Sequence, residues 1–88
     1  MPKRAHIIVG VHVHNRTKQV PEVQRVLSEF GSIIRTRLGL HEVDDKGEAA
    51  AGIIILELIG TAAAADHLMR QLRKCRGVQV KKLVFAHR

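Results

Sequence analysis

Two periodic patterns of hydrophobic residues alternate along the chain, one typical of strands and the other typical of helices. Residues 6–13 alternate between two faces, and this period-two pattern rich in β-branched residues predicts a strand. One face carries Ile7, Val9, Val11 and Val13, and the other carries His6, Ile8, Gly10 and His12. Apolar residues then recur at helical spacing from Val20 to Phe30, and Gly31 follows as a candidate C-cap. The chain is therefore expected to open with a strand and a helix.

The rest of the chain predicts a strand, a turn, a strand, a helix and a strand. Residues 32–40 alternate, with Ile34, Thr36, Leu38 and Leu40 expected on one face and Ile33, Arg35, Arg37 and Gly39 on the other. The polar residues 43–48 indicate a turn. Residues 53–59, within the predicted strand 49–59, are apolar on both faces, which favours a central position. Residues 62–76 have high helix propensity, with Thr61 as the candidate N-cap and Gly77 ending the helix. Residues 78–85 are expected to form the last strand.

The two halves of the chain resemble each other. A shift of 46 positions matches Ile7 with Ile53, Val23 with Met69, Val26 with Leu72 and Gly31 with Gly77. Two fused βαβ halves of this size predict a ferredoxin-like βαββαβ sandwich of the α+β class. Right-handed crossovers would place both helices on one face of a four-stranded antiparallel sheet. We expect residues 1–88 to form a single domain.

The sheet face without helices is expected to be apolar. We predict that it carries Ile8, Ile33 and one side of residues 53–59, with His6, His12 and Arg35 nearby. An apolar open face on so small a domain favours self-association, so we expect a dimer or tetramer. Glu57 lies among apolar neighbours in the third strand, and we expect it to pair with Arg35 or Arg37.

Composition excludes several classes of protein. The 88 residues carry 15 Lys+Arg, 8 Asp+Glu and a lone Cys75, for a net charge of +7. One cysteine excludes an intramolecular disulfide and fits a reducing compartment, and no apolar run approaches the roughly 20 residues of a membrane span. We therefore expect a cytoplasmic protein with no membrane attachment. No nucleophile motif or glycine-rich phosphate loop is present, so we expect no enzymatic activity and no organic cofactor.

Several motifs together resemble a known family. They are Asn15-Arg16, Leu27-Ser28-Glu29-Phe30-Gly31, Arg35-Thr36-Arg37-Leu38-Gly39-Leu40 and Arg76-Gly77-Val78-Gln79-Val80-Lys81. With the strand at residues 53–58, they resemble the iron-only hydrogenase system regulator family. Its members are small domains similar to ACT domains and to the C-terminal domain of the nickel-responsive regulator. Members usually have Pro where His41 stands.

The resemblance implies a regulatory domain that binds a small effector or a partner protein as an oligomer. It also implies a link to transcriptional regulation of iron-only hydrogenase maturation. ACT-like domains bind effectors where the first strand meets the first helix. In this sequence that junction corresponds to His14, Asn15, Arg16 and Thr17.

Two histidines raise an alternative hypothesis, a metal-binding sensor for a divalent ion such as nickel or zinc. His12 and His14 are two residues apart, so strand alternation places both imidazoles on one face, about 7 Å apart. Further ligands would have to come from His6, His41, His87 or Cys75. Cys75 falls on the apolar face of the second predicted helix, where we expect it to be buried.

The basic residues raise a third hypothesis, a nucleic-acid accessory protein that binds without sequence preference. No acid follows Asp66, whereas the basic residues there include Arg70, Arg73, Lys74, Arg76, Lys81 and Lys82. A solvated basic face is the simpler interpretation of this patch. No groove-reading motif is present, so transcriptional regulation would require a partner protein with a DNA-binding domain.

Overall fold

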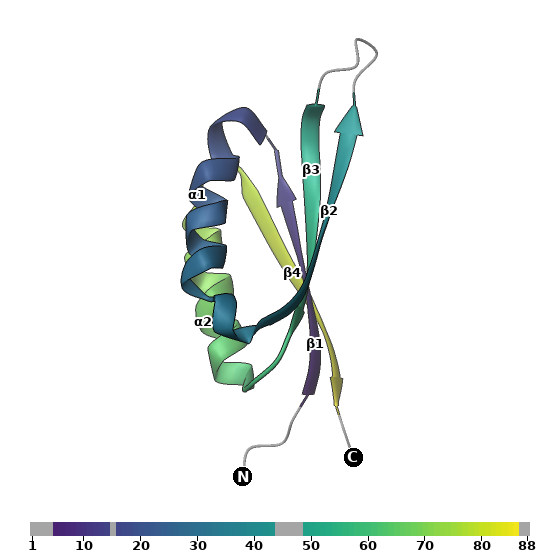
Figure 1. Cartoon of the computed structure of the whole chain (residues 1–88), viewed down its shortest axis with the longest axis vertical. Helices are drawn as coiled ribbons and strands as arrows, with labels where there is room; N and C mark the ends of the chain where they lie inside the picture. The colour runs from purple at the N-terminus through teal and green to yellow at the C-terminus, as the bar shows by residue number, and fades with distance from the viewer. Residues whose placement is uncertain (1–4, 15, 44–48, 87–88) are drawn as a thin grey trace.

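The computed structural model describes residues 5–14, 16–43 and 49–86. In chain order the elements are β1 (Ala5–Val13), α1 (Arg16–Glu29), the short 3-10 helix η1 (Gly31–Ile33), β2 (Ile34–Val43), β3 (Ala49–Leu58), α2 (Ala62–Arg73) and β4 (Val78–Ala86). The four strands form one antiparallel sheet in the order β2-β3-β1-β4. Figure 1 shows both helices on one side of this sheet. The predicted ferredoxin-like α+β fold is therefore confirmed.

The core lies between the helices and the sheet. It consists of Ile7, Val9, Val11, Val13, Val23, Val26, Leu27, Leu56, Leu58, Ala65, Leu68, Met69, Leu72, Cys75 and Val80. In β1 every second residue from Ile7 to Val13 is buried, as the alternation predicts. Neither helix of the described chain is long and apolar enough to cross a membrane.

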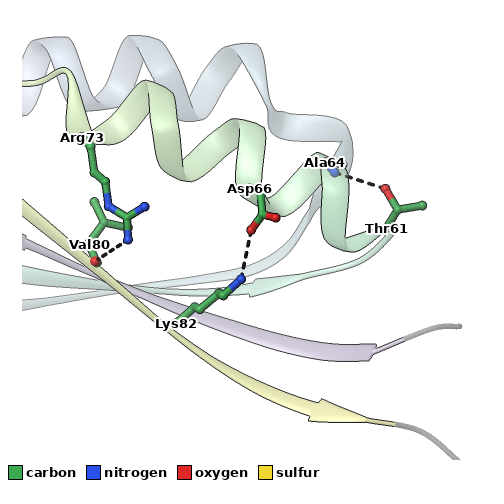
Figure 2. Close-up of polar contacts among 6 residues, drawn as sticks. All are labelled: Thr61, Ala64, Asp66, Arg73, Val80 and Lys82. Atoms are coloured by element: carbon green, nitrogen blue, oxygen red, sulfur yellow. Dashed lines mark hydrogen bonds and ion pairs between the residues drawn. The ribbon is translucent and has the colours of Figure 1, made fainter. Parts of the chain in front are cut away.

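Polar contacts hold α2 at its start and against β4 (Figure 2). The Thr61 hydroxyl accepts a hydrogen bond from the Ala64 N–H at 3.1 Å, so Thr61 is the N-cap that the sequence predicts. The Arg73 guanidinium donates to the Val80 carbonyl at 3.2 Å, and the Lys82 ammonium lies 3.0 Å from an Asp66 carboxylate oxygen. The helix ends at Arg73, earlier than predicted, and Gly77 adopts a positive φ of 72° immediately before β4.

In β2, Thr36, Leu38 and Leu40 share one face as predicted, but that face is the open one, so the side assigned to them is wrong. Residues 31–33 form η1 instead of extended strand, and the pairing with β3 shifts between Ile34 and Thr36. Ile33 consequently packs against the core, not on the open face. Beyond the shift, Thr36 lies opposite Glu57 and Leu38 opposite Ile55. A one-residue irregularity moves every later side chain to the other face, so Leu38 and Leu40 lie on the open face.

The open face is apolar, and more so than the sequence analysis expected. Its large exposed hydrophobic residues are Leu38, Leu40, Leu83 and Phe85. Ile8, Ile53 and Ile55 lie among them and are half-buried. Residues on adjacent strands that pair directly share a face, so these side chains form one continuous surface across four strands. Among the described residues, the helices leave this surface uncovered (Figure 1).

The internal repeat holds for the helices but not for the strands that precede them. Val23 and Met69 are both buried, as are Val26 and Leu72. By contrast, Ile7 is buried while its predicted counterpart Ile53 is half-buried on the open face. The buried strand residue Val13 corresponds instead to Leu58, one position earlier than the shift predicts. The connection from strand to helix is thus one residue longer in the second half.

Candidate functional site

A crevice of about 120 Å³ lies beneath the middle of α1. Its walls include Val13 at the end of β1, Val20 and Gln24 of α1, Arg37 and Gly39 of β2, and Ile54 of β3. Val13 and Gly52 face each other in the β1–β3 ladder, and Gly39 faces Ile54 in the β2–β3 ladder. The crevice therefore lies on the helix side of the sheet, next to the junction of β1 and α1.

The polar groups at the crevice are Arg37 and Gln24. The Arg37 guanidinium donates a hydrogen bond to the Gln24 side-chain carbonyl, which links β2 to α1. A Cβ added at Gly39 would meet no atom within 4 Å, so the missing side chain leaves space in the wall. A cation at the rim of an apolar hollow can bind an anion that also carries an apolar group.

The predicted effector residues begin directly after Val13. His14 is exposed, and its N–H donates to the Gly77 carbonyl at 3.0 Å, which extends the β1–β4 pairing by one residue. Asn15 lies outside the described residues. Arg16 and Thr17 start α1, and their side chains also lie outside the description. The assignment of these residues to an effector site stays a prediction, adjacent to the crevice.

The histidine pair provides too few ligands for a metal ion by itself. His12 is half-buried opposite Ile53 and Gln79, whereas His14 is exposed beyond the end of β1. In the described ranges, no three His, Cys, Asp or Glu residues come together to hold a metal. Structural zinc takes four ligands, so the metal hypothesis would need ligands from elsewhere. Cys75 is buried as predicted, and burial raises the pKa of its thiol.

Glu57 forms a polar cluster on the open face that the sequence analysis missed. One carboxylate oxygen accepts from the Thr36 hydroxyl at 2.8 Å, and the other lies 2.7 Å from His6 Nε2. The pKa of Glu57 is below its ordinary value near 4.5. The hydrogen bond from Thr36 is the largest cause, and the hydrogen bond with His6 is the next. Of the two expected partners, Arg37 lies on the helix side of the sheet and does not pair with Glu57. The positive charge of Arg35 also lowers the pKa of Glu57, as the smallest of the causes.

The predicted basic patch is divided between two faces. Lys81 lies opposite Gly10 on the open face, whereas its neighbour Lys82 lies on the helix side and pairs with Asp66. The guanidinium of Arg73 is hydrogen-bonded to β4 (Figure 2). Arg70, Lys74 and Arg76 are exposed. All six residues of the patch are exposed, but they do not form one continuous surface, and a role for them stays a prediction.

The fold defines this chain as a small ferredoxin-like α+β protein. A family model matches residues 5–82, and the chain belongs to that family, the TM1266-like family, described as "Iron-only hydrogenase system regulator, putative". The predicted resemblance is thereby confirmed. No curated protein sequence matches the chain.

Solved structures share the fold at low sequence identity. The structure of protein TM1266 from Thermotoga maritima has a TM-score of 0.78 at 24% identity, covering 93% of this chain and 98% of that chain. CPII, a nitrogen regulatory PII-like protein from Thiomonas intermedia K12, has a TM-score of 0.55 at 10% identity in its apo form, covering 96% and 95%. CPII bound to ADP, AMP and bicarbonate has a TM-score of 0.54 at 14% identity, covering 94% and 92%.

Proposed function

We propose that this protein is a non-enzymatic regulator that binds a small effector and works as an oligomer. The observation that carries the proposal is the crevice at the junction of β1 and α1, where Val13 and Val20 meet the cation Arg37. His14, Asn15, Arg16 and Thr17 connect these walls along the chain and would contribute to the effector site. Membership of a family of regulators supports the same function.

Oligomerisation is the second part of the proposal. Leu83 and Phe85 are 61% and 58% exposed on the open face, and Leu38 is 54% exposed. Large side chains exposed together on one surface favour association with a second copy of the chain. An apolar interface would also supplement the thin core of a domain of this size.

Regulation of transcription for a hydrogenase system would require a partner protein in this proposal. Arg70 of α2 and Lys74 at its C-cap are exposed. No acidic residue follows Asp66 in this helix. Such a surface contacts phosphates but offers few groups that read bases. The partner would therefore carry the DNA-binding domain, and the effector would control its association with this protein.

A ligand screen by thermal unfolding tests the proposed function. A ligand that binds only the folded state raises the midpoint temperature of unfolding, and the rise increases with ligand concentration. Small carboxylates, amino acids, ADP, AMP and bicarbonate form the panel, because the PII-like relative CPII has been solved with the last three. We expect at least one member to stabilise the protein. If none does at millimolar concentration, the effector proposal is wrong.

The same material tests the two alternative functions. One zinc or nickel ion per chain that withstands mild chelation and disappears in the His12→Ala/His14→Ala variant would favour the metal sensor. Salt-sensitive binding to duplex DNA of any sequence would favour the nucleic-acid accessory protein.

A further inference from the structure

We infer that the crevice beneath α1 binds a short, branched aliphatic carboxylate, with Arg37 as the cation that pairs with its carboxylate group. This inference rests on the proposed effector function and specifies the chemical class of the effector. Three features of the crevice carry it: its charge, its size and the pairing state of Arg37.

The charge of the crevice favours an anion. Arg37 is a cation at its wall, and none of the described lining residues is acidic. The described partner of Arg37 is the neutral side-chain carbonyl of Gln24. A guanidinium has five N–H donors, so this one bond leaves others for a ligand. A carboxylate matches the planar guanidinium in a bidentate, charge-assisted pair.

The size and lining of the crevice favour a short apolar chain. An engineered cavity of about 150 Å³ accommodates one benzene molecule, and this crevice measures about 120 Å³. Val13, Val20 and Ile54 supply apolar surface, and the space beside Gly39 is open. A branched chain of a few carbons fills such a volume, whereas a nucleotide is too large to fit in it.

The absence of a carboxylate in the described lining also predicts selectivity against zwitterions. An α-ammonium group would lie close to the Arg37 guanidinium without an acidic partner among these residues. A like-charge contact of this kind is unfavourable. The crevice should therefore prefer isovalerate to valine, which has the same carbon skeleton and an added ammonium group.

Backbone NMR of the full chain tests the inference with three matched probes. We expect isovalerate to shift the amide signals of Gly39 and Gly52, and the shifts should saturate with a dissociation constant of roughly millimolar or below. The signals of Gly31 and Gly60, outside the crevice, should stay in place. Isovaleramide lacks the charge and valine adds an ammonium group, so both should bind about tenfold or more weakly.

Two variants locate the binding site. Arg37→Gln should weaken isovalerate binding about tenfold or more, whereas Arg35→Gln, which removes an equal charge two residues away, should not change it. Gly39→Leu should fill the crevice and abolish binding while circular dichroism stays native. Gly39→Ala, whose Cβ meets no neighbour, provides a smaller obstruction if the leucine variant fails to fold.

The outcomes separate this inference from the proposed function. Binding of isovalerate that survives Arg37→Gln, or binding in which Gly39 and Gly52 do not respond, would overturn the inference. Stabilisation by another panel member alone would also overturn it but would leave the effector proposal standing. If neither isovalerate nor any other panel member binds, both are wrong.

Discussion

Glu57 is the residue whose chemistry depends most on strands distant in sequence. Its carboxylate contacts Thr36 from β2 and His6 from β1, and these contacts favour the ionised form. The pKa in the folded protein is therefore below the value in the unfolded chain. The resulting contribution to stability is present above the unfolded value near 4.5 and is lost as the pH falls through the folded pKa.

Removing the Thr36 hydroxyl should raise the pKa of Glu57. In Thr36→Val the carboxylate loses the largest cause of its lowered pKa, so we expect the titration midpoint to move towards its ordinary value. Carbon-13 NMR of the Glu57 carboxyl group measures this midpoint directly. Thr36→Ser keeps the hydroxyl and should change it little. An unchanged midpoint in the valine variant would show that Thr36 does not hold the ionised form.

At the scale of elements, α2 has a defined beginning and a firm attachment to the sheet. Thr61 satisfies the Ala64 N–H at the first turn, while Leu68 and Leu72 are buried against the sheet. The Asp66–Lys82 ion pair is 47% and 40% exposed at its two side chains, so it adds little to stability. The cap and the apolar face are therefore the principal local determinants of this helix.

Loss of the cap should destabilise the protein measurably. Thr61→Ala leaves the Ala64 N–H without its described partner, and we expect the free energy of unfolding to fall by about 1 kcal/mol. Urea denaturation monitored by circular dichroism measures the change. Thr61→Ser retains the hydroxyl oxygen and should stay within a few tenths of a kcal/mol. Equal stability of the alanine and serine variants would rule out a capping role.

At the scale of the whole molecule, the two sides of the sheet differ in what covers them. The helices cover one side (Figure 1), while the open face carries exposed Leu38, Leu83 and Phe85. Leu83 and Val84 are neighbours in β4 whose side chains lie on different sides of the sheet. Leu83 pairs with Ile8 of the open face, whereas Val84 pairs with the buried Ile7. Both are exposed, at 61% and 50%, and they form a matched pair for testing which face associates.

A lysine on the open face should dissociate the oligomer. We expect the unaltered protein to scatter light as a dimer or larger species at micromolar concentration. Leu83→Lys should give a monomer with native circular dichroism, because it places a charge in the proposed interface. Val84→Lys adds the same charge on the other side and should leave the mass unchanged. A monomeric mass for the unaltered protein would refute the proposed association.

Local pattern was sufficient for the order of the elements. The alternation in β1 and the helical spacing in α2 predicted their buried faces, because both signals depend on neighbours within a few positions. The motifs spread along the chain were sufficient for the family. Thr61 and Cys75 also occupy the positions that the sequence analysis assigned to them.

Only the tertiary structure decided which residues meet across the sheet. The shift between Ile34 and Thr36 reverses the faces of β2, brings Thr36 to Glu57 and moves Leu38 to the open face. It also leaves Arg37 and Gly39 beside Gln24, and so creates the crevice. Residue periodicity is equally satisfied by either face of a strand. The choice depends on pairing with β3 and on contact with α1, and these interactions join segments far apart in the chain.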